Sequence, residues 1–283
     1  MFEEQNTISN PFDSEVSSTQ TIPTFTFYSS DTLFALKLEH VLSVNDDLDQ
    51  IQTLPIKGQG ILGVYKYQNS MVPIFDFAKL IGVDSGQVVM QSLIENLELR
   101  EKEHVDWLDA LNQSLEDENI AFTKALDPHK CAFGKWYDGF ETRDETLRDI
   151  LVQFDVPHKH IHSLANKLFA LRDQGKQAEA LDCLHIERHG TLRRLESLFS
   201  QACEQVKSAM RPVILFVTKD GVVPTFGIIV DEINDVIEYN ADAIQSDIGI
   251  NSHSENSNLF SGMYVGEDGV DSIICNVDDI VPR

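Results

Sequence analysis

Short runs of β-branched and aromatic residues dominate both ends of the chain. The N-terminal part carries five such runs, separated by turn-forming residues: Thr24–Tyr28, Leu33–Leu36, Val41–Val44, Ile61–Tyr67 and Met71–Phe75. Comparable runs return after Pro212: Val213–Val217, Thr225–Val230, Val236–Tyr239 and Ser272–Cys275. Because no helical pattern separates the strands within either end, we expect two antiparallel β lobes rather than an alternating α/β sheet.

The middle of the chain has a different periodicity. From about Val88 to Met210 apolar residues recur three and four positions apart, and Gly and Pro are sparse, which predicts amphipathic helices. An inserted segment must leave and re-enter its host at neighbouring points, and an even number of antiparallel helices satisfies this condition. We therefore expect an inserted four-helix bundle, with helices over 88–113, around 133–140, over 157–173 and over 177–208.

Charge narrows the class of partner. Asp and Glu number 46 against 22 Lys and Arg, a formal net charge of -24, so most of the surface would repel a nucleic-acid backbone. Residues outside 91–210 carry 24 of the acidic and only 7 of the basic side chains, so the β-rich ends are the more acidic part. The N-terminus lacks a basic, apolar signal sequence and no apolar run is long enough to cross a membrane, which favours a cytoplasmic protein without membrane insertion. The first 20 or so residues are polar and are expected to form a disordered tail.

Histidines and cysteines of the helical segment have metal-binding spacing. His158 and His162 are four residues apart just after Pro157, a residue suited to the first turn of a helix, so both imidazoles should share one face. His104 lies on a mostly apolar helix face. None of the four cysteines forms a CxxC pair, so each is expected to be a free thiol or a metal ligand.

Together, His104, Cys131, His158 and His162 would complete a tetrahedral zinc site. Rival ligands remain: His129 and His160 lie close by in sequence, and Cys183, His185 and His189 form a second cluster. The second cluster ranks lower because Cys183 would point about 200° away from His185 on a helix.

A site of three imidazoles and one thiolate would leave Cys131 deprotonated and open to oxidants, so Cys131 is the predicted redox-reactive residue. Its loss as a ligand could rearrange the helices, since zinc binding and folding are coupled in small sites. A zinc hydrolase is not expected, because Lys159 stands where such enzymes carry a Glu beside the first His. We expect no catalytic residues and no enzyme activity.

The pattern HxxW, then CxFGxW, then HxxxH, at His104–Trp107, Cys131–Trp136 and His158–His162, resembles the chemoreceptor zinc-binding (CZB) domain, a bacterial four-helix module. The resemblance implies that His104, Cys131, His158 and His162 bind zinc. It also implies sensing of zinc or of oxidants such as hypochlorous acid.

The flanking β segments resemble the CheW-like chemotaxis adaptors. The resemblance rests on runs in both ends of the chain: Phe34–Leu36, Ile61–Val64, Val72–Phe77, Phe226–Ile233 and Phe260–Gly262. It implies an α+β fold of two SH3-like antiparallel β-barrels interrupted by the zinc-binding bundle. The expected organisation is a tail over 1–20, CheW-like halves over 21–87 and 211–283, and the insert over 88–210.

The implied function is that of a non-enzymatic adaptor that docks a chemotaxis histidine kinase, chemoreceptors, or both. One departure bears on this: where the family usually has an Arg-Gly pair, the turn carries Gln68 and Asn69, and loss of the Arg could weaken a receptor or kinase contact. The alternative is a scaffold with a purely structural zinc site and a client outside chemotaxis. Exposed barrel edges and the long fourth helix also allow a homodimer.

Overall fold

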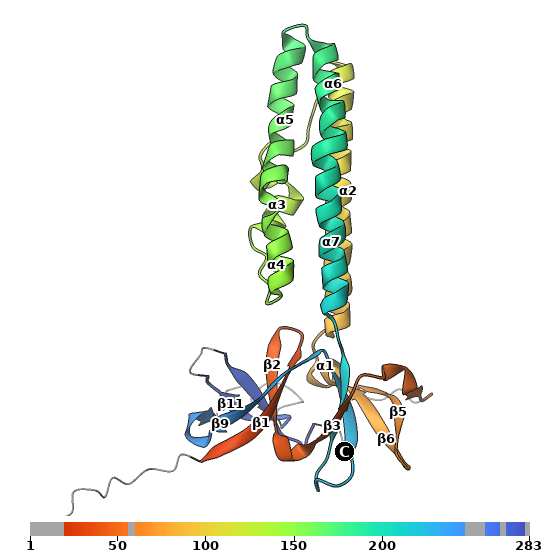
Figure 1. The fold of residues 1–283 in the computed structure, drawn as a ribbon, viewed down its shortest axis with the longest axis vertical. Coiled ribbons are helices and arrows are strands. Elements are labelled where there is room, and N and C mark those ends of the chain that lie inside the picture. The colour runs from red at the N-terminus through yellow and green to blue at the C-terminus, as the bar shows by residue number, and fades with distance from the viewer. Residues whose placement is uncertain (1–19, 56–59, 247–257, 267–269, 281–283) are drawn as a thin grey trace, which may run out of the picture. The chain divides into compact units, whose positions relative to one another are not determined.

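The computed structural model describes residues 20–55, 60–246, 258–266 and 270–280. Of the tail expected over 1–20, all but Gln20 lies outside these residues. The chain forms two compact units, one made of residues up to Val83 together with residues from Val213 onward, and the other of Asp84–Pro212. The first unit contains the β-sheets and the second contains the long helices (Figure 1).

The first sheet has six strands in the order β10-β11-β12-β2-β1-β9. Their bounds are β1 Thr21–Ser29, β2 Thr32–Lys37, β9 Glu232–Asn240, β10 Ile244–Gln245, β11 Phe260–Tyr264 and β12 Ser272–Cys275. All neighbours are antiparallel except β12 and β2, which run parallel. A tight turn at Ser30, which has a positive φ of 52°, joins β1 to β2.

The second sheet also has six strands, in the order β3-β7-β8-β6-β5-β4. Their bounds are β3 Val41–Asn45, β4 Gln52–Thr53, β5 Ile61–Tyr67, β6 Ser70–Asp76, β7 Val213–Val217 and β8 Phe226–Val230. The parallel pair here is β6 with β8. The short helix α1, Phe77–Ile81, follows β6; the Asp76 carboxylate caps it by accepting from the Lys79 N–H.

Each sheet draws strands from both ends of the chain, which differs from the expectation of two β lobes flanking the insert in sequence order. β1 and β2 pair with strands that follow the helical unit, and β7 and β8 lie between β3 and β6. The core explains why: Phe27, Phe34 and Phe77 from the N-terminal segment pack in one cluster with Leu215 and Phe226 from the C-terminal segment. Neither segment can bury its apolar faces without the other.

The helical unit contains three long rods, formed by α2, by α5, and by α6 with α7, together with two short helices, α3 and α4. Their bounds are α2 Gly86–Glu116, α3 Ala132–Tyr137, α4 Glu145–Val152, α5 Asp155–Asp173, α6 Gln177–Glu187 and α7 Arg193–Ala209, with the π-helical turn η4 over Arg188–Leu192 and the short 3-10 turn η3 over Pro128–Lys130. The helices expected at 88–113 and 157–173 correspond to α2 and α5. The side chains of Arg172 and Gln177 donate to carbonyls at the C-terminal end of α2, which ties the α5–α6 turn to that end.

Two details of the helices differ from the sequence expectation. The helix expected around 133–140 is only α3, and a separate helix α4 follows it, capped by the Asp144 carboxylate. The helix expected over 177–208 is interrupted by η4. Side-chain contacts hold this turn: Arg188 forms an ion pair with Asp109 on α2, and Glu187 accepts from Thr191.

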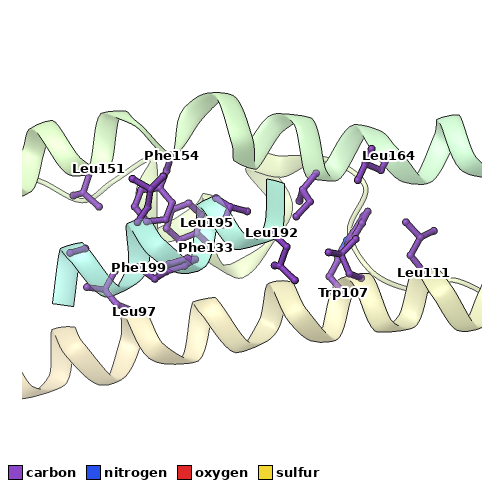
Figure 2. Close-up of a cluster of buried hydrophobic side chains, with 14 of the residues drawn as sticks. Leu97, Trp107, Leu111, Phe133, Leu151, Phe154, Leu164, Leu192, Leu195 and Phe199 are labelled. Carbon is purple, nitrogen blue, oxygen red and sulfur yellow. The ribbon is translucent and has the colours of Figure 1, made fainter. Parts of the chain in front are cut away.

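The apolar core of the helical unit runs along the facing sides of α2, α5 and α7 (Figure 2). Phe133, from α3, packs into it against Phe154 and Phe199. Leu97, Leu108 and other α2 residues at helical spacing are fully buried there, as the sequence periodicity predicts.

Across the described residues, no helix is both long enough and apolar enough to cross a membrane.

Candidate metal centre

Three helical elements bring the four expected ligands together. His104 lies on the buried face of α2, and His158 and His162 lie one turn apart on the buried face of α5. Cys131 is the N-cap residue of α3. The three imidazoles are buried and the Cys131 side chain is half-buried.

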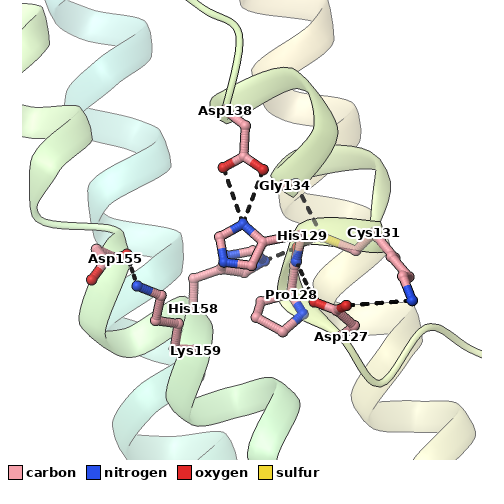
Figure 3. Close-up of polar contacts among 10 residues, drawn as sticks. Asp127, Pro128, His129, Cys131, Gly134, Asp138, Asp155, His158 and Lys159 are labelled. Carbon is pink, nitrogen blue, oxygen red and sulfur yellow. Dashed lines mark hydrogen bonds and ion pairs between the residues drawn. The ribbon is translucent and has the colours of Figure 1, made fainter.

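The loop before α3 presents the Cys131 sulfur to the histidines. Asp127 caps the 3-10 turn η3, where its carboxylate accepts from the His129 N–H. The Gly134 N–H donates to Cys131 Sγ at 3.1 Å, and the thiol donates to the Pro128 carbonyl at 3.2 Å. Figure 3 shows this loop. Cys131 Sγ lies 3.2 Å from His158 Nε2.

Gly134 is required at its position because the backbone there packs against the preceding turn. A Cβ on Gly134 would lie 1.9 Å from the Pro128 carbonyl oxygen. Only glycine therefore allows α3 to begin directly beneath Cys131.

One possible ligand atom from each of His104, Cys131, His158 and His162 lies within 4.8 Å of the other three. In a tetrahedral zinc site with bonds of about 2.0 to 2.3 Å, ligand atoms are roughly 3.3 to 3.8 Å apart, so a small contraction suffices. The four residues predicted from the sequence are the only group of three or more candidate ligands in the part of the chain that the structure describes.

Backbone carbonyls fix the orientation of two imidazoles. His104 Nδ1 lies 2.7 Å from the Arg100 carbonyl, and His162 Nδ1 lies 3.0 Å from the Ala125 carbonyl. Each carbonyl can only accept, so each Nδ1 carries the proton and each Nε2 has a free lone pair. Both Nε2 atoms are buried and lack a hydrogen-bond partner among the described residues, which is costly unless a metal ion binds them.

The electrostatics also suit a cation bound by neutral imidazoles. Burial, followed by repulsion from the neighbouring imidazoles, lowers the pKa of His158 to about 3 and that of His162 to about 4. Burial lowers the pKa of His104 as well. All three rings are therefore neutral at pH 7 and need lose no proton to bind a metal.

The cysteine differs in this respect. Burial raises the pKa of the Cys131 thiol, although the Gly134 and Phe133 N–H groups act in the opposite direction. In the metal-free protein the sulfur is therefore protonated at pH 7, and metal binding must displace that proton.

Aromatic rings surround the ligands. Phe133 and Phe199 pack edge-on or tilted against His158 and His104, at ring-centroid distances of 4.9 and 5.8 Å. The ring centroids of Trp107 and His162 are 5.1 Å apart. Trp107 Nε1 donates to the Ala125 carbonyl, which also accepts from His162 Nδ1.

The second tryptophan of this segment is Trp136, on α3. It contacts Phe133 and Phe140, so the Phe133 ring lies between it and the imidazoles.

The rival ligands lie elsewhere. His160 pairs with Glu187 at 2.9 Å, and His129 pairs with Asp138 at 2.9 Å.

In the second cluster, the ring centroids of His185 and His189 are 4.4 Å apart. Cys183 Sγ instead lies 3.8 Å from Lys167 Nζ. Neither histidine of this pair gains a third ligand among the described residues.

Sequence reasoning missed the backbone contributors. The carbonyls of Arg100 and Ala125 orient two ligands, yet a carbonyl leaves no residue-type signal. For Arg100 the i, i+4 relation to His104 on one helix would have indicated it. Ala125 lies in an irregular segment and had no such signal.

Comparison with known protein families finds a match within the helical unit. Residues 104–169 match the family model described as the chemoreceptor zinc-binding domain, CZB. The matched segment contains all four candidate ligands and covers under a quarter of the chain. The helical unit therefore contains a zinc-binding domain of this family.

Similarity over the whole chain is weaker. A search of curated proteins finds no match. Among solved structures, the scaffolding protein TtCheW from Thermoanaerobacter tengcongensis is 11% identical, with a TM-score of 0.41 over 91% of this chain and 90% of that chain.

Proposed function

We propose that this chain is a cytoplasmic chemotaxis adaptor that acts by binding rather than by catalysis, and whose helical unit holds zinc through His104, Cys131, His158 and His162. The observation that carries the zinc site is the pair of buried Nε2 atoms, on His104 and His162, that lie near the Cys131 sulfur without a hydrogen-bond partner among the described residues. The match of residues 104–169 to the chemoreceptor zinc-binding family supports the same ligand set.

The ligand set can be tested by metal analysis. Purified protein should contain about one zinc per chain, and Cys131→Ala or His158→Ala should lose most of it. Cys183→Ala and His160→Ala are matched controls, because each removes the same type of side chain outside the proposed set and should keep the metal. Full zinc content in both ligand variants would refute the assignment.

We further propose that Cys131 is the residue that senses oxidants. When bound, zinc keeps the Cys131 sulfur as a thiolate at neutral pH, which is the nucleophilic form. Attack of the thiolate on hypochlorous acid forms an S–O bond and breaks the O–Cl bond, giving the sulfenic acid and chloride. Cys131 is half-buried and so is more exposed to solvent than the three buried histidines.

A loss of the Cys131 ligand would reach α7 through packed rings. Phe199 on α7 contacts both His104 and Phe133, and α7 continues within a few residues into β7 of the sheet unit. A change at the metal therefore has a packed route to α7, and α7 is joined covalently to the strands that would dock partners.

The alternative is a purely structural zinc site in a scaffold with another client. Its supporting observation is that three of the four ligands are buried, at 4%, 4% and 1% exposure for His104, His158 and His162. Titration with hypochlorous acid separates the two: a sensor releases zinc while helical circular dichroism persists, whereas a structural site keeps its zinc until the protein unfolds.

The proposed partners are a chemotaxis histidine kinase and chemoreceptors. Gln68 lies at the tip of the β5–β6 hairpin and is exposed, so its side chain is available to a partner. In a pull-down with a chemotaxis kinase, Gln68→Arg should bind at least as well as the natural protein. Failure of both forms to bind would point to a different client.

A further inference from the structure

The strand β9 forms one edge of the first sheet. It pairs with β1, and it has no strand on its other side among the described residues. Seven consecutive residues, 232–238, are exposed on this strand. An edge of this length is a template for another strand unless it is protected.

The backbone of β9 is only partly committed to β1. Opposite Thr26 the register shifts, and the Asp235 N–H and carbonyl both bond to the Thr26 hydroxyl. The next amide, that of Val236, donates to the Asp235 carboxylate at 2.7 Å. The Asp235 carboxylate therefore accepts from the Val236 N–H, a donor that could instead bond to a carbonyl of an incoming strand.

Apolar side chains on β9 are left without cover. Ile233 and Val236 are in register with Phe27 and Phe25, which belong to the core of the sheet unit. They nevertheless remain 37% and 48% exposed. A strand added beside β9 would extend the core face over both of them.

Charge selects the occupant. β9 carries Glu232, Asp235 and Glu238 and no Lys or Arg, so a second copy of the same strand would bring acids against acids. A segment with Lys or Arg would instead pair with them. We propose that the β9 edge binds an extended, basic segment of a partner protein by β-strand addition; the inference rests on the proposed docking role and names the chemistry of one partner.

The test uses the full-length protein and a fluorescein-labelled octapeptide of alternating lysine and valine. We expect saturable binding by fluorescence anisotropy, weakened about fivefold or more by Glu238→Lys, which replaces an attractive cross-strand pair with a repulsive one. Asp49→Lys makes the same charge change at an exposed residue between β3 and β4 of the second sheet. This variant should bind the peptide within about twofold of the natural protein.

A second measurement separates strand addition from a general charge effect. The same peptide, N-methylated at alternate residues, keeps its charge but cannot donate along one edge, so it should not bind. Hydrogen exchange of the Val236 amide should slow only with the unmodified peptide. Equal binding of the methylated peptide, no binding of either, or protection located elsewhere would overturn the inference.

Two further outcomes are informative. Concentration-dependent protection of Val236 without peptide would assign the edge to a second copy and refute a basic partner. The assay involves neither zinc nor a chemotaxis kinase, and Glu238→Lys should retain its zinc, so failure here is distinguishable from failure of the proposed function.

Discussion

Replacing Gly134 by Ala should weaken zinc binding without removing any ligand. The added Cβ would lie 1.9 Å from the Pro128 carbonyl oxygen, whereas ordinary contacts begin near 3.4 Å, so α3 and the turn before it must separate by about 1.5 Å. That separation also breaks the Gly134 N–H bond to Cys131 Sγ. A zinc–sulfur bond of about 2.3 Å tolerates only about 0.2 Å of displacement.

Overpacking of this kind costs about 1 to 3 kcal/mol. If the turn relieves the clash by moving Cys131, the same free energy is lost from zinc binding, and the zinc affinity should fall roughly 5- to 150-fold. Competition with a chromophoric chelator measures this affinity, and circular dichroism checks that the helices remain folded.

Gly139→Ala is the matched control. A Cβ at Gly139 has no atom within 4 Å and the backbone there is unstrained, so zinc affinity should stay at the level of the natural protein. The reasoning is refuted if Gly134→Ala folds and binds zinc within twofold of Gly139→Ala.

Three other results are expected. Zinc binding at pH 7 should release about one proton per chain, because Cys131 is the only ligand that must lose a proton to bind. Calorimetry in buffers of different ionisation enthalpy measures the number of protons released. A release near zero or above two would contradict the prediction. The metal-free protein should lose stability as the pH falls from about 6.5 toward 3, because folding lowers the pKa values of His158 and His162, so that the unfolded chain binds more protons in that window. Denaturant titrations at several pH values measure the free energy of unfolding, which should depend less steeply on pH in His162→Gln. Trp107→Phe removes the bond to the carbonyl that orients His162 and should lower zinc affinity several-fold, whereas Trp136→Phe should not, and equal effects would show that Trp107 acts only by packing.

Much of the metal centre was predictable because its signals are local. The spacing of His158 and His162 after Pro157 fixes two ligands on one helix face, and the apolar stripe of α2 carries His104 inward. The four ligands come from three separate segments, however, and only the folded chain shows that they meet while His129 and His160 pair with carboxylates.

The fold divides in the same way. Periodicity in the sequence predicted most strands and the long helices, because burial of alternate or every third to fourth residue is a property of each segment alone. It did not predict α4 or the π-helical turn η4, which depend on a cap and on contacts with α2.

By itself, the sequence determined the β-rich ends, the helical insert, the acidic surface and the residues that suit zinc. Tertiary structure decided which strands pair, so that each sheet combines strands from before and after the insert. It also decided which carbonyls orient His104 and His162 and why residue 134 must be glycine. The physical reason is that backbone groups and strand edges are chemically alike along the chain, so their partners are selected only when distant segments bury a common core.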